Sequence, residues 1–317
     1  MHKTIFFWII CLGFWAELPA QENPQVKPAL GGILSKFSTL RDLTISAGGD
    51  EVYFTIQSPT EEVSTISFLR KKNKQWSEPA IAPFSGKYKD LEPFLTPDGL
   101  RLYFVSDRPL DMASDKPKDF DIWYVSRKSL LDSWSAPVNL GIPVNTEYNE
   151  FYPALSANNN LYYTSDAPGS KGKDDIFMAK WENNQYINPT SLSDSINSKA
   201  YEFNAFVAPD ESYLIYTIYQ ASDGLGSGDL YLSFRNTDGN WSKATNLGAV
   251  VNSTRMDYCP FVHSATQTLY FTSRRTAIST PKLGFAGMEK LLKTIQQYEN
   301  GQSRIYQIQI KNLLLKN

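Results

Sequence analysis

One strand-turn-strand unit recurs five times along the chain, and this repeat constrains the fold more than any other feature. The fullest copy, LEPFLTPDGLRLYFVSD, runs from residue 91 to residue 107 and places two short strands around a Pro-Asp-Gly turn. Aligned on one position of the second strand, the copies are spaced 50, 59, 53 and 55 residues apart. The aligned residues are Tyr53, Tyr103, Tyr162, Ile215 and Tyr270. Periods of this length are typical of solenoids, propellers and arrays.

Each period contains enough extended segments for a four-stranded propeller blade. A third strand follows each hairpin, as in DIWYVSRK from residue 121, and a fourth segment begins with an aromatic residue. These aromatic residues are Trp76, Trp134, Tyr186 and Trp241, and we expect the three tryptophans to pack between blades. The copies lack the periodicity of a helical solenoid. We therefore predict an all-β fold, a β-propeller of four-stranded antiparallel blades, with five blades; a degenerate sixth blade is the alternative.

The two ends of the repeat array are expected to meet. The fifth copy has no aromatic fourth segment, whereas residues 28–37 precede the first copy without a partner of their own. We expect this N-terminal segment to complete the last blade, because closing the ring removes exposed sheet edges. The predicted domain covers residues 21–317, with repeats at about 38–86, 87–146, 147–198, 199–253 and 254–317.

The first residues have the layout of a secretory signal peptide. A basic start is followed by an apolar run from Ile5 to Trp15, and we expect cleavage after Ala20. The predicted location is therefore periplasmic or secreted. Ile10 before Cys11 replaces the small residue of a lipoprotein signal, so we do not expect lipid anchoring. No later apolar run approaches the roughly 18 residues of a transmembrane helix. We also expect the protein to be a monomer.

Composition excludes several classes of site from the processed chain. Of the cysteines and histidines, only Cys259 and His263 would remain after cleavage. An internal disulfide and a zinc site of His and Cys ligands are therefore not expected, and a Ser-His-Asp triad would depend on His263 alone. The formal net charge of -2 gives no indication of a nucleic acid or an anionic membrane as partner.

The segments EPFLTPDGLRLYFVSD and DIWYV resemble the WD40-like, or PD40, repeat of the TolB-type propellers, which also occurs in many exported bacterial proteins. The resemblance covers nearly all of the processed chain and implies the propeller fold, but it implies little about function. TolB itself adds an N-terminal domain and usually has six blades, so we do not expect a direct role in a Tol-Pal system. Peptidases with similar propellers carry a G-x-S-x-G elbow, which this sequence lacks.

An acidic residue stands at the start of four repeats, five residues after an Asn or Ser. The motifs SGKYKD, NTEYNE, NSKAYE and NSTRMD end in Asp90, Glu150, Glu202 and Asp257, whereas the first repeat has Leu40 in this place and Asp42 nearby. Because the first strand of a blade lines the channel, these four carboxylates are the predicted binding residues. The alternative, which we favour, is that each accepts backbone N–H bonds from the loop entering its blade. No catalytic or metal-binding residue is assigned.

Two features break the repeat. The loop DRPLDMASDKPKDFD brings five acids together, from Asp107 to Asp121, which would suit Ca²⁺; we favour a solvated loop and expect no cofactor. In the last blade, residues 287–301 predict an amphipathic helix. We expect it to pack its apolar face on the ring, with docking of a partner as the alternative.

These observations favour an exported, non-catalytic propeller that binds a protein or an envelope glycan. The alternative is a glycan-active hydrolase that uses carboxylates at the channel mouth, since five-bladed propellers also serve glycosidases. Against an enzyme, the sequence lacks a catalytic His or Cys constellation and the Asp-box pattern of sialidases. The separation of the carboxylates and the bonds they make would distinguish the two hypotheses.

Overall fold

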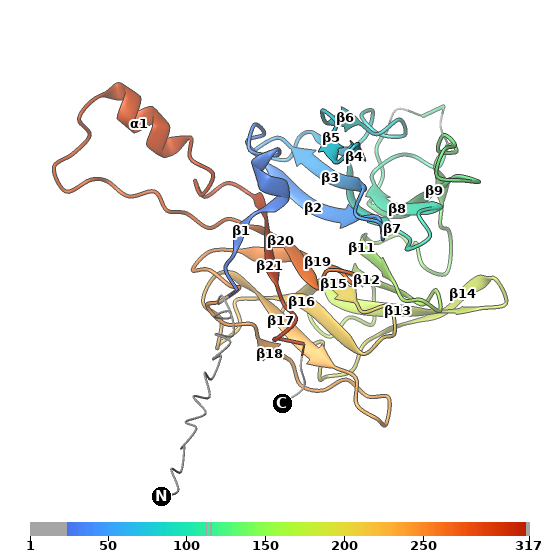
Figure 1. Ribbon diagram of the computed structural model, residues 1–317. Helices are drawn as coiled ribbons and strands as arrows, with labels where there is room; N and C mark the ends of the chain where they lie inside the picture. Colours follow the sequence, from blue (N-terminus) through green and yellow to red (C-terminus); the bar gives the residue numbers. More distant parts are fainter. Residues whose placement is uncertain (1–23, 112, 115, 315–317) are drawn as a thin grey trace, which may run out of the picture.

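The chain forms a ring of five antiparallel sheets around a central channel, as the repeat predicts (Figure 1). The computed structural model describes residues 24–111, 113–114 and 116–314. The predicted signal peptide, with its cleavage site after Ala20, lies outside the described residues. Within them, no helix is both long and apolar enough to cross a membrane.

In each blade the first strand lies at the channel and the later strands follow outward. The first blade contains β2 (Leu40–Ile45), β3 (Glu51–Gln57), β4 (Ser64–Lys72), and the short strands β5 (Gln75–Trp76) and β6 (Ala80–Ile81), which both pair with β4. The second contains β7 (Asp90–Leu95), β8 (Arg101–Ser106), β9 (Asp121–Ser126) and β10 (Val138–Asn139). The third contains β11 (Glu150–Leu155), β12 (Leu161–Ser165), β13 (Asp175–Glu182) and β14 (Gln185–Ser191). The fourth contains β15 (Glu202–Val207), β16 (Tyr213–Tyr219), β17 (Gly228–Phe234) and β18 (Thr245–Asn246).

The fifth blade combines both ends of the described chain. Its sheet contains β19 (Asp257–His263), β20 (Thr268–Ser273), β21 (Arg304–Gln309) and, outermost, β1 (Lys27–Pro28). Lys27 lies opposite Gln307, so an N-terminal strand closes the ring. The strand is shorter than the segment predicted to supply it, because a 3-10 helix, η1 (Ala29–Gly32), follows at once. Gly31 and Gly32 have φ values of 65° and 85°, which turn the chain out of the extended conformation.

Aromatic side chains fill the seams, which are the contact surfaces between neighbouring blades. Trp134 of the second blade meets Tyr53 of the first edge-to-face, with ring centroids 6.2 Å apart, and its indole N–H donates to the Tyr53 hydroxyl at 2.8 Å. Trp241 of the fourth blade meets Tyr162 of the third in the same way, at 6.4 Å. These contacts confirm the predicted packing between blades for Trp134 and Trp241.

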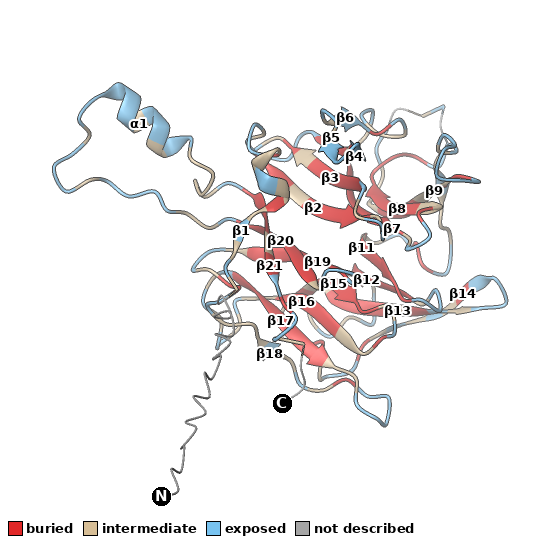
Figure 2. Ribbon diagram, in the orientation of Figure 1, coloured by how far each residue is buried: buried red, intermediate tan, exposed pale blue. Residues whose placement is uncertain are grey.

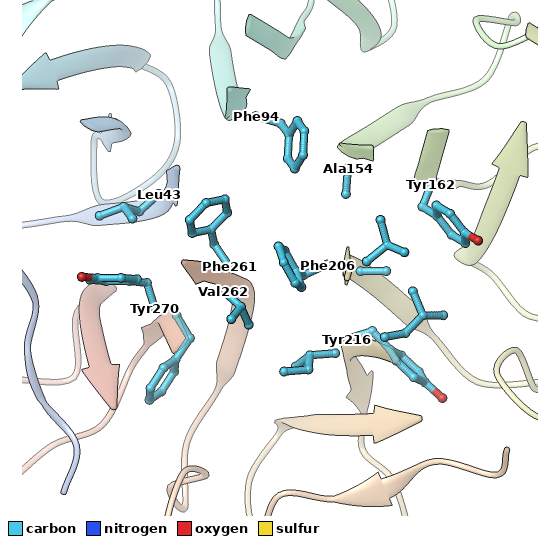
Figure 3. Packing of buried hydrophobic residues seen from close by; sticks show 14 of the residues in the cluster. Leu43, Phe94, Ala154, Tyr162, Phe206, Tyr216, Phe261, Val262 and Tyr270 are labelled. Atoms are coloured by element: carbon cyan, nitrogen blue, oxygen red, sulfur yellow. The ribbon is translucent and has the colours of Figure 1, made fainter. Parts of the chain in front are cut away.

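Below its mouth the channel is filled by apolar side chains. Figure 3 shows Leu43, Phe94, Ala154, Phe206 and Phe261, one from the inner strand of each blade, converging on the ring axis. All five are buried, and the rings of Phe206 and Phe261 meet edge-to-face at 5.6 Å. The channel is therefore a packed core at this depth, and burial increases from the outer loops towards the inner strands (Figure 2).

The helix of the last blade differs from its prediction. It spans only α1 (Met288–Ile295) and lies on an arm that projects away from the ring (Figure 1). No residue of α1 is buried, and Met288 is 67% exposed (Figure 2). The expectation that its apolar face packs on the ring is therefore wrong. An amphipathic pattern predicts that a helix has an apolar face, but it does not say which surface covers that face.

Candidate functional site

The four acids predicted as binding residues each begin an inner strand and are completely or almost completely buried. Their side chains contact the loop that leads into their own blade. Glu150 accepts hydrogen bonds from the Thr146 hydroxyl at 2.6 Å and the Thr146 N–H at 3.2 Å. Glu202 accepts the equivalent bonds from Ser198, at 2.6 and 2.9 Å. This is the geometry expected of an acid that holds its loop.

The other two acids are also neutralised by an arginine. Asp90 accepts from the Ser85 hydroxyl at 2.8 Å and from the Arg108 guanidinium at 2.5 Å. Asp257 accepts from the N–H of Ser253 at 2.6 Å and from Arg275 at 3.0 Å. None of the four acids is among the residues that line the cavity at the channel mouth. The binding role assigned to them stays a prediction, and the bonds they make are those of loop anchors.

Burial controls the protonation of these acids. It raises the pKa of Asp90, Glu202 and Asp257, although their hydrogen-bond partners act in the opposite direction. Burial raises the pKa of Glu150 to about 7, against the opposing effect of the hydrogen bonds from Thr146. A raised pKa at these positions thus follows from their place in the fold.

A β-bulge in every inner strand creates the polar centre of the channel. Each inner strand contains one extra residue relative to its neighbour. One residue of each bulge has a positive φ between 51° and 56°, a region that non-glycine residues seldom occupy. We call these five residues the polar ring: Asp42, Glu92, Tyr152, Asn204 and Cys259.

Arg41 connects three members of the polar ring. Its Nε donates to Asp42 Oδ1 at 2.9 Å, and its Nη2 donates to Glu92 Oε1 at 2.5 Å. The same Nη2 lies 3.5 Å from Cys259 Sγ. A single guanidinium therefore neutralises two carboxylates that lie almost entirely out of water.

Hydrogen bonds within the polar ring occupy most of its remaining acceptors. The Glu92 N–H donates to Asp42 Oδ2 at 3.1 Å, and the Tyr152 N–H donates to Glu92 Oε2 at 2.7 Å. The Asn204 amide donates to Glu92 Oε1 at 3.3 Å and accepts from the Cys259 thiol at 3.4 Å. Burial raises the pKa of Glu92 to about 7, against the opposing effect of Arg41.

A cavity of about 350 Å³ opens above the polar ring. The residue before each polar-ring member lines it, so all five blades contribute; we call these the mouth residues: Arg41, Leu91, Phe151, Phe203 and Tyr258. Glu92 and Asn204 of the polar ring also line the cavity, which gives it a polar floor. The bulges explain this arrangement, because they let consecutive residues of one strand reach the channel.

The rim of the cavity carries aromatic and charged side chains from the outer loops. Phe120 packs on Phe151 with ring centroids 5.2 Å apart. Lys89 and Arg274 place positive charge at the rim, whereas Glu61 and Asp174 place negative charge there. The cavity can therefore hold a group with an apolar body and several hydrogen-bonding atoms.

The polar ring contains one cluster with metal-ligating atoms. Asp42, Glu92 and Cys259 bring a ligand atom each to within 4.8 Å of one another, the sole group of this kind among residues 24–111, 113–114 and 116–314. The residues present do not fit a metal ion, because the Arg41 guanidinium already contacts all three. In addition, burial raises the pKa of the Cys259 thiol, whereas a metal requires the thiolate.

The other sequence candidates lie away from the mouth cavity. In the acidic loop, Lys118 Nζ lies 2.9 Å from Asp119 Oδ2 and 2.6 Å from Asp121 Oδ1, so an internal ammonium occupies this part of the loop. Calcium binding there stays a prediction. The ring nitrogens of His263 contact the Thr266 hydroxyl and the carbonyl oxygens of Ser46 and Ala47, so its contacts are not those of a Ser-His-Asp triad.

Comparisons with known proteins agree with the fold. No protein-family model matches the chain, and no curated protein matches it. Among solved structures, the α-L-arabinofuranosidase from Lactobacillus brevis is 16% identical, with a TM-score of 0.50 and coverage of 86% of this chain and 91% of that one. The catalytic domain of the Coprinopsis cinerea GH62 α-L-arabinofuranosidase is 10% identical, with the same TM-score and the same coverages.

TolB from Acinetobacter baumannii is also similar, at 10% identity and a TM-score of 0.48, with coverage of 86% of this chain. The chain spans 54% of the length of that TolB structure. Likeness at these identities is a likeness of fold. The ring of five antiparallel sheets confirms the β-propeller that the TolB-type resemblance implies, while membership of the PD40 repeat family stays a prediction.

Proposed function

We propose that the protein is an exported, non-catalytic binding propeller whose ligand site is the mouth cavity. One observation carries this proposal: the central carboxylates, Asp42 and Glu92, share one guanidinium, and each also accepts a backbone N–H bond. Such a network supports a rigid floor under a binding site, because its acceptors are already satisfied. The ligand is a protein or a cell-envelope glycan, encountered in the periplasm or outside the cell.

The size and chemistry of the cavity support a protruding group as the bound unit. A cavity of about 350 Å³ is at the small end of ligand pockets, so it accommodates a sugar residue or a large side chain of a bigger molecule. Phe151, Phe203 and Tyr258 supply apolar contact, whereas Asn204 and Glu92 form a polar floor whose hydrogen bonds are made mostly within the polar ring. The charged rim residues then contact whatever surrounds the inserted group.

A glycan-active hydrolase is the second candidate, and Glu92 is the observation that favours it. A buried carboxyl group with a pKa of about 7 that lines a cavity has the character of a general acid. Asp174 lines the same cavity and would be the second carboxylate. The pair of Asp42 and Glu92 is less suitable, because its ligand atoms lie within 4.8 Å, closer than the roughly 5 to 9.5 Å of glycosidase pairs.

The test compares binding and hydrolysis by matched variants. Phe151→Ala combined with Phe203→Ala removes two cavity walls without removing any hydrogen-bonding side chain of the polar ring. Retention of defined envelope proteins and glycans on the immobilised protein is measured, with Lys180→Gln on the exposed end of β13 as the control. We expect the wall variant to lose a ligand that wild type and control retain, after melting curves establish that all three fold.

Hydrolysis is measured in parallel on arabinofuranosides and envelope glycans. The binding proposal expects no turnover by wild type. Turnover that is abolished by Glu92→Gln, in a variant that still folds, would replace the binding proposal by the hydrolase. Equal retention of every ligand by wild type and wall variant would instead remove the mouth cavity as the site.

A further inference from the structure

The seam between the second and third blades departs from the pattern of the other aromatic seams, and this difference creates a second cavity. At the seam of the first and second blades, Arg127 Nη2 donates to Glu51 Oε2 at 2.6 Å, and its guanidinium lies 4.3 Å from the centre of the Trp134 ring. The arginine thus has both a carboxylate partner and an indole that covers it.

The seam of the third and fourth blades repeats this arrangement with other residues. Arg235 forms an ion pair with Glu211, and its guanidinium lies 5.6 Å from the centre of the Trp241 ring. Asn160 of the third blade donates to the same carboxylate at 2.8 Å. Each of these two seams therefore combines an arginine, a carboxylate and a tryptophan.

The seam between the second and third blades has a different residue type at each of these three positions. Counted from the aligned aromatic position, Arg101 takes the place of Glu51. Counted from the start of the third strand, Trp181 takes the place of Arg127, and Tyr186 replaces the tryptophan. In the turn where the fourth blade has Glu211, the third blade has Asn159; both residues have a positive φ. Both places that supply a carboxylate elsewhere thus carry other residues here.

As a result, Arg101 has no carboxylate partner among residues 24–111, 113–114 and 116–314. Its Nη1 donates to the Tyr103 hydroxyl at 3.0 Å, and its guanidinium lies 4.8 Å from the centre of the Tyr124 ring. Tyrosine contacts hold the guanidinium in place but do not neutralise it. The geometry leaves a positioned, partly buried cation that an anionic ligand can pair with.

The space around Arg101 is large enough for such a ligand. Two adjoining cavities of about 640 and 700 Å³ share Arg101, Trp181, Asn184 and Tyr186 in their walls. Trp181 packs edge-to-face on Tyr186, with ring centroids 4.7 Å apart, so its indole is held in one orientation. The first cavity includes the turn residues 96–98, at the opposite end of the strands from the mouth.

We propose that this seam is a second binding site and that it takes a carboxylated saccharide, such as a uronate residue of a glycan. The planar guanidinium of Arg101 matches a carboxylate bidentately. Trp181 and the neighbouring tyrosines offer flat apolar surface for a sugar ring, and the amides of Asn159 and Asn184 offer donors and acceptors for hydroxyl groups. This site is independent of the mouth cavity.

The probes are trimers of galacturonate, glucuronate and mannuronate, each compared with its neutral trisaccharide by titration calorimetry on the purified protein. We expect wild type to bind at least one acidic trimer at least about tenfold more tightly than the neutral counterpart, with affinity falling as salt rises. Arg101→Gln is expected to weaken that binding by at least about tenfold. Trp181→Ala is expected to weaken the acidic and the neutral trimer alike.

Arg235→Gln is the matched control, because it removes a seam arginine of the same charge that already has a carboxylate partner. It should leave binding unchanged, as should the Phe151→Ala and Phe203→Ala variant of the mouth. If Arg101→Gln does not fold, Arg101→Lys replaces it, since lysine keeps the charge but loses the planar fork. Equal binding of acidic and neutral trimers, or equal effects of the Arg101 and Arg235 variants, would overturn the proposal.

Discussion

The guanidinium of Arg41 in the first blade lies 2.5 Å from the carboxylate of Glu92 in the second, and both residues come from bulged inner strands. This contact joins two blades at the floor of the mouth cavity. Because Arg41 also neutralises Asp42, the centre of the propeller depends on one arginine.

Removing that arginine should destabilise the fold strongly. Arg41→Gln leaves the buried carboxylates of Asp42 and Glu92 without their counter-charge, and breaking a buried pair of this kind costs about 3–5 kcal/mol. Urea unfolding followed by tryptophan fluorescence measures the difference. Lys180→Gln, at an exposed ion pair, is the control and should change the unfolding free energy by less than about 1 kcal/mol. A similarly small effect of Arg41→Gln would show that the polar ring does not hold the blades together.

Glu150 should make stability fall as the pH rises towards neutrality. Its pKa is about 7 in the fold and 4.5 in the unfolded chain, so between these values the folded state binds more protons. The contribution of the protonated Glu150 carboxyl group to the stability of the fold is fully present below about pH 4.5 and is lost as the pH rises through about 7. Between about pH 5 and pH 8, the unfolding free energy of wild type should therefore fall by about 2 kcal/mol more than that of Glu150→Gln.

Urea midpoints at the two pH values measure this difference. Glu182→Gln removes an exposed carboxylate and should keep the wild-type pH dependence. The same slope in wild type and in Glu150→Gln would contradict the assignment of a raised pKa to Glu150.

The seam contact between Trp134 and Tyr53 should appear as an energetic coupling. Trp134→Phe and Tyr53→Phe each remove the hydrogen bond between the two side chains, so their effects should not add. We expect a coupling of about 1 kcal/mol in a double-mutant cycle. Trp241→Phe paired with Tyr53→Phe should be additive, because Trp241 packs in a different seam. A coupling near zero for the first pair would mean that each blade keeps its own packing.

The arm that carries α1 should be dispensable for folding. Replacing residues 280–296 with a short Gly-Ser linker removes the helix but keeps Tyr298, whose hydroxyl donates to the Ile305 carbonyl at 2.7 Å. Since α1 buries no residue, we expect the melting temperature to stay within a few degrees of wild type. The N–H of Ala277 donates to the Glu299 carbonyl and keeps the ends of the deletion together. A large drop in melting temperature would mean that the helix packs on the ring after all.

The repeat allowed the architecture to be predicted because every blade restates the same pattern. The hairpin and the aromatic fourth segment recur at one spacing, so a misreading of one copy is corrected by the others. The strand-initial acids were found in the same way. Their burial follows from a repeat position, where each acid serves the loop of its own blade.

The polar ring was missed because a bulge is not visible in the alternation of a sequence. An inner strand without a bulge would send Arg41 and Asp42 to opposite faces, and only the extra residue brings both to the channel. A signal was nevertheless present. Arg41 is the one charged residue at a position where the other repeats have Leu91, Phe151, Phe203 and Tyr258.

The seam cavity was also present in the sequence as a departure from the repeat. Tyr186 stands where three repeats have tryptophan, and Arg101 stands where the first repeat has an acid. The effect of these residue changes can be inferred only when the facing residue across the seam is known, because the residues that face each other come from different repeats. Pairing across blades is a property of the ring, and a single repeat does not contain it.

The pairing of β1 with β21 also sets the order in which the molecule can be completed. Lys27 lies opposite Gln307, so β1 has no partner strand until almost the whole chain has been synthesised. Until then the first blade has no neighbour on one side, and β1 is unpaired. The ring therefore closes last, when β21 pairs with β1. Because these two strands are far apart in the sequence, this pairing should be slow.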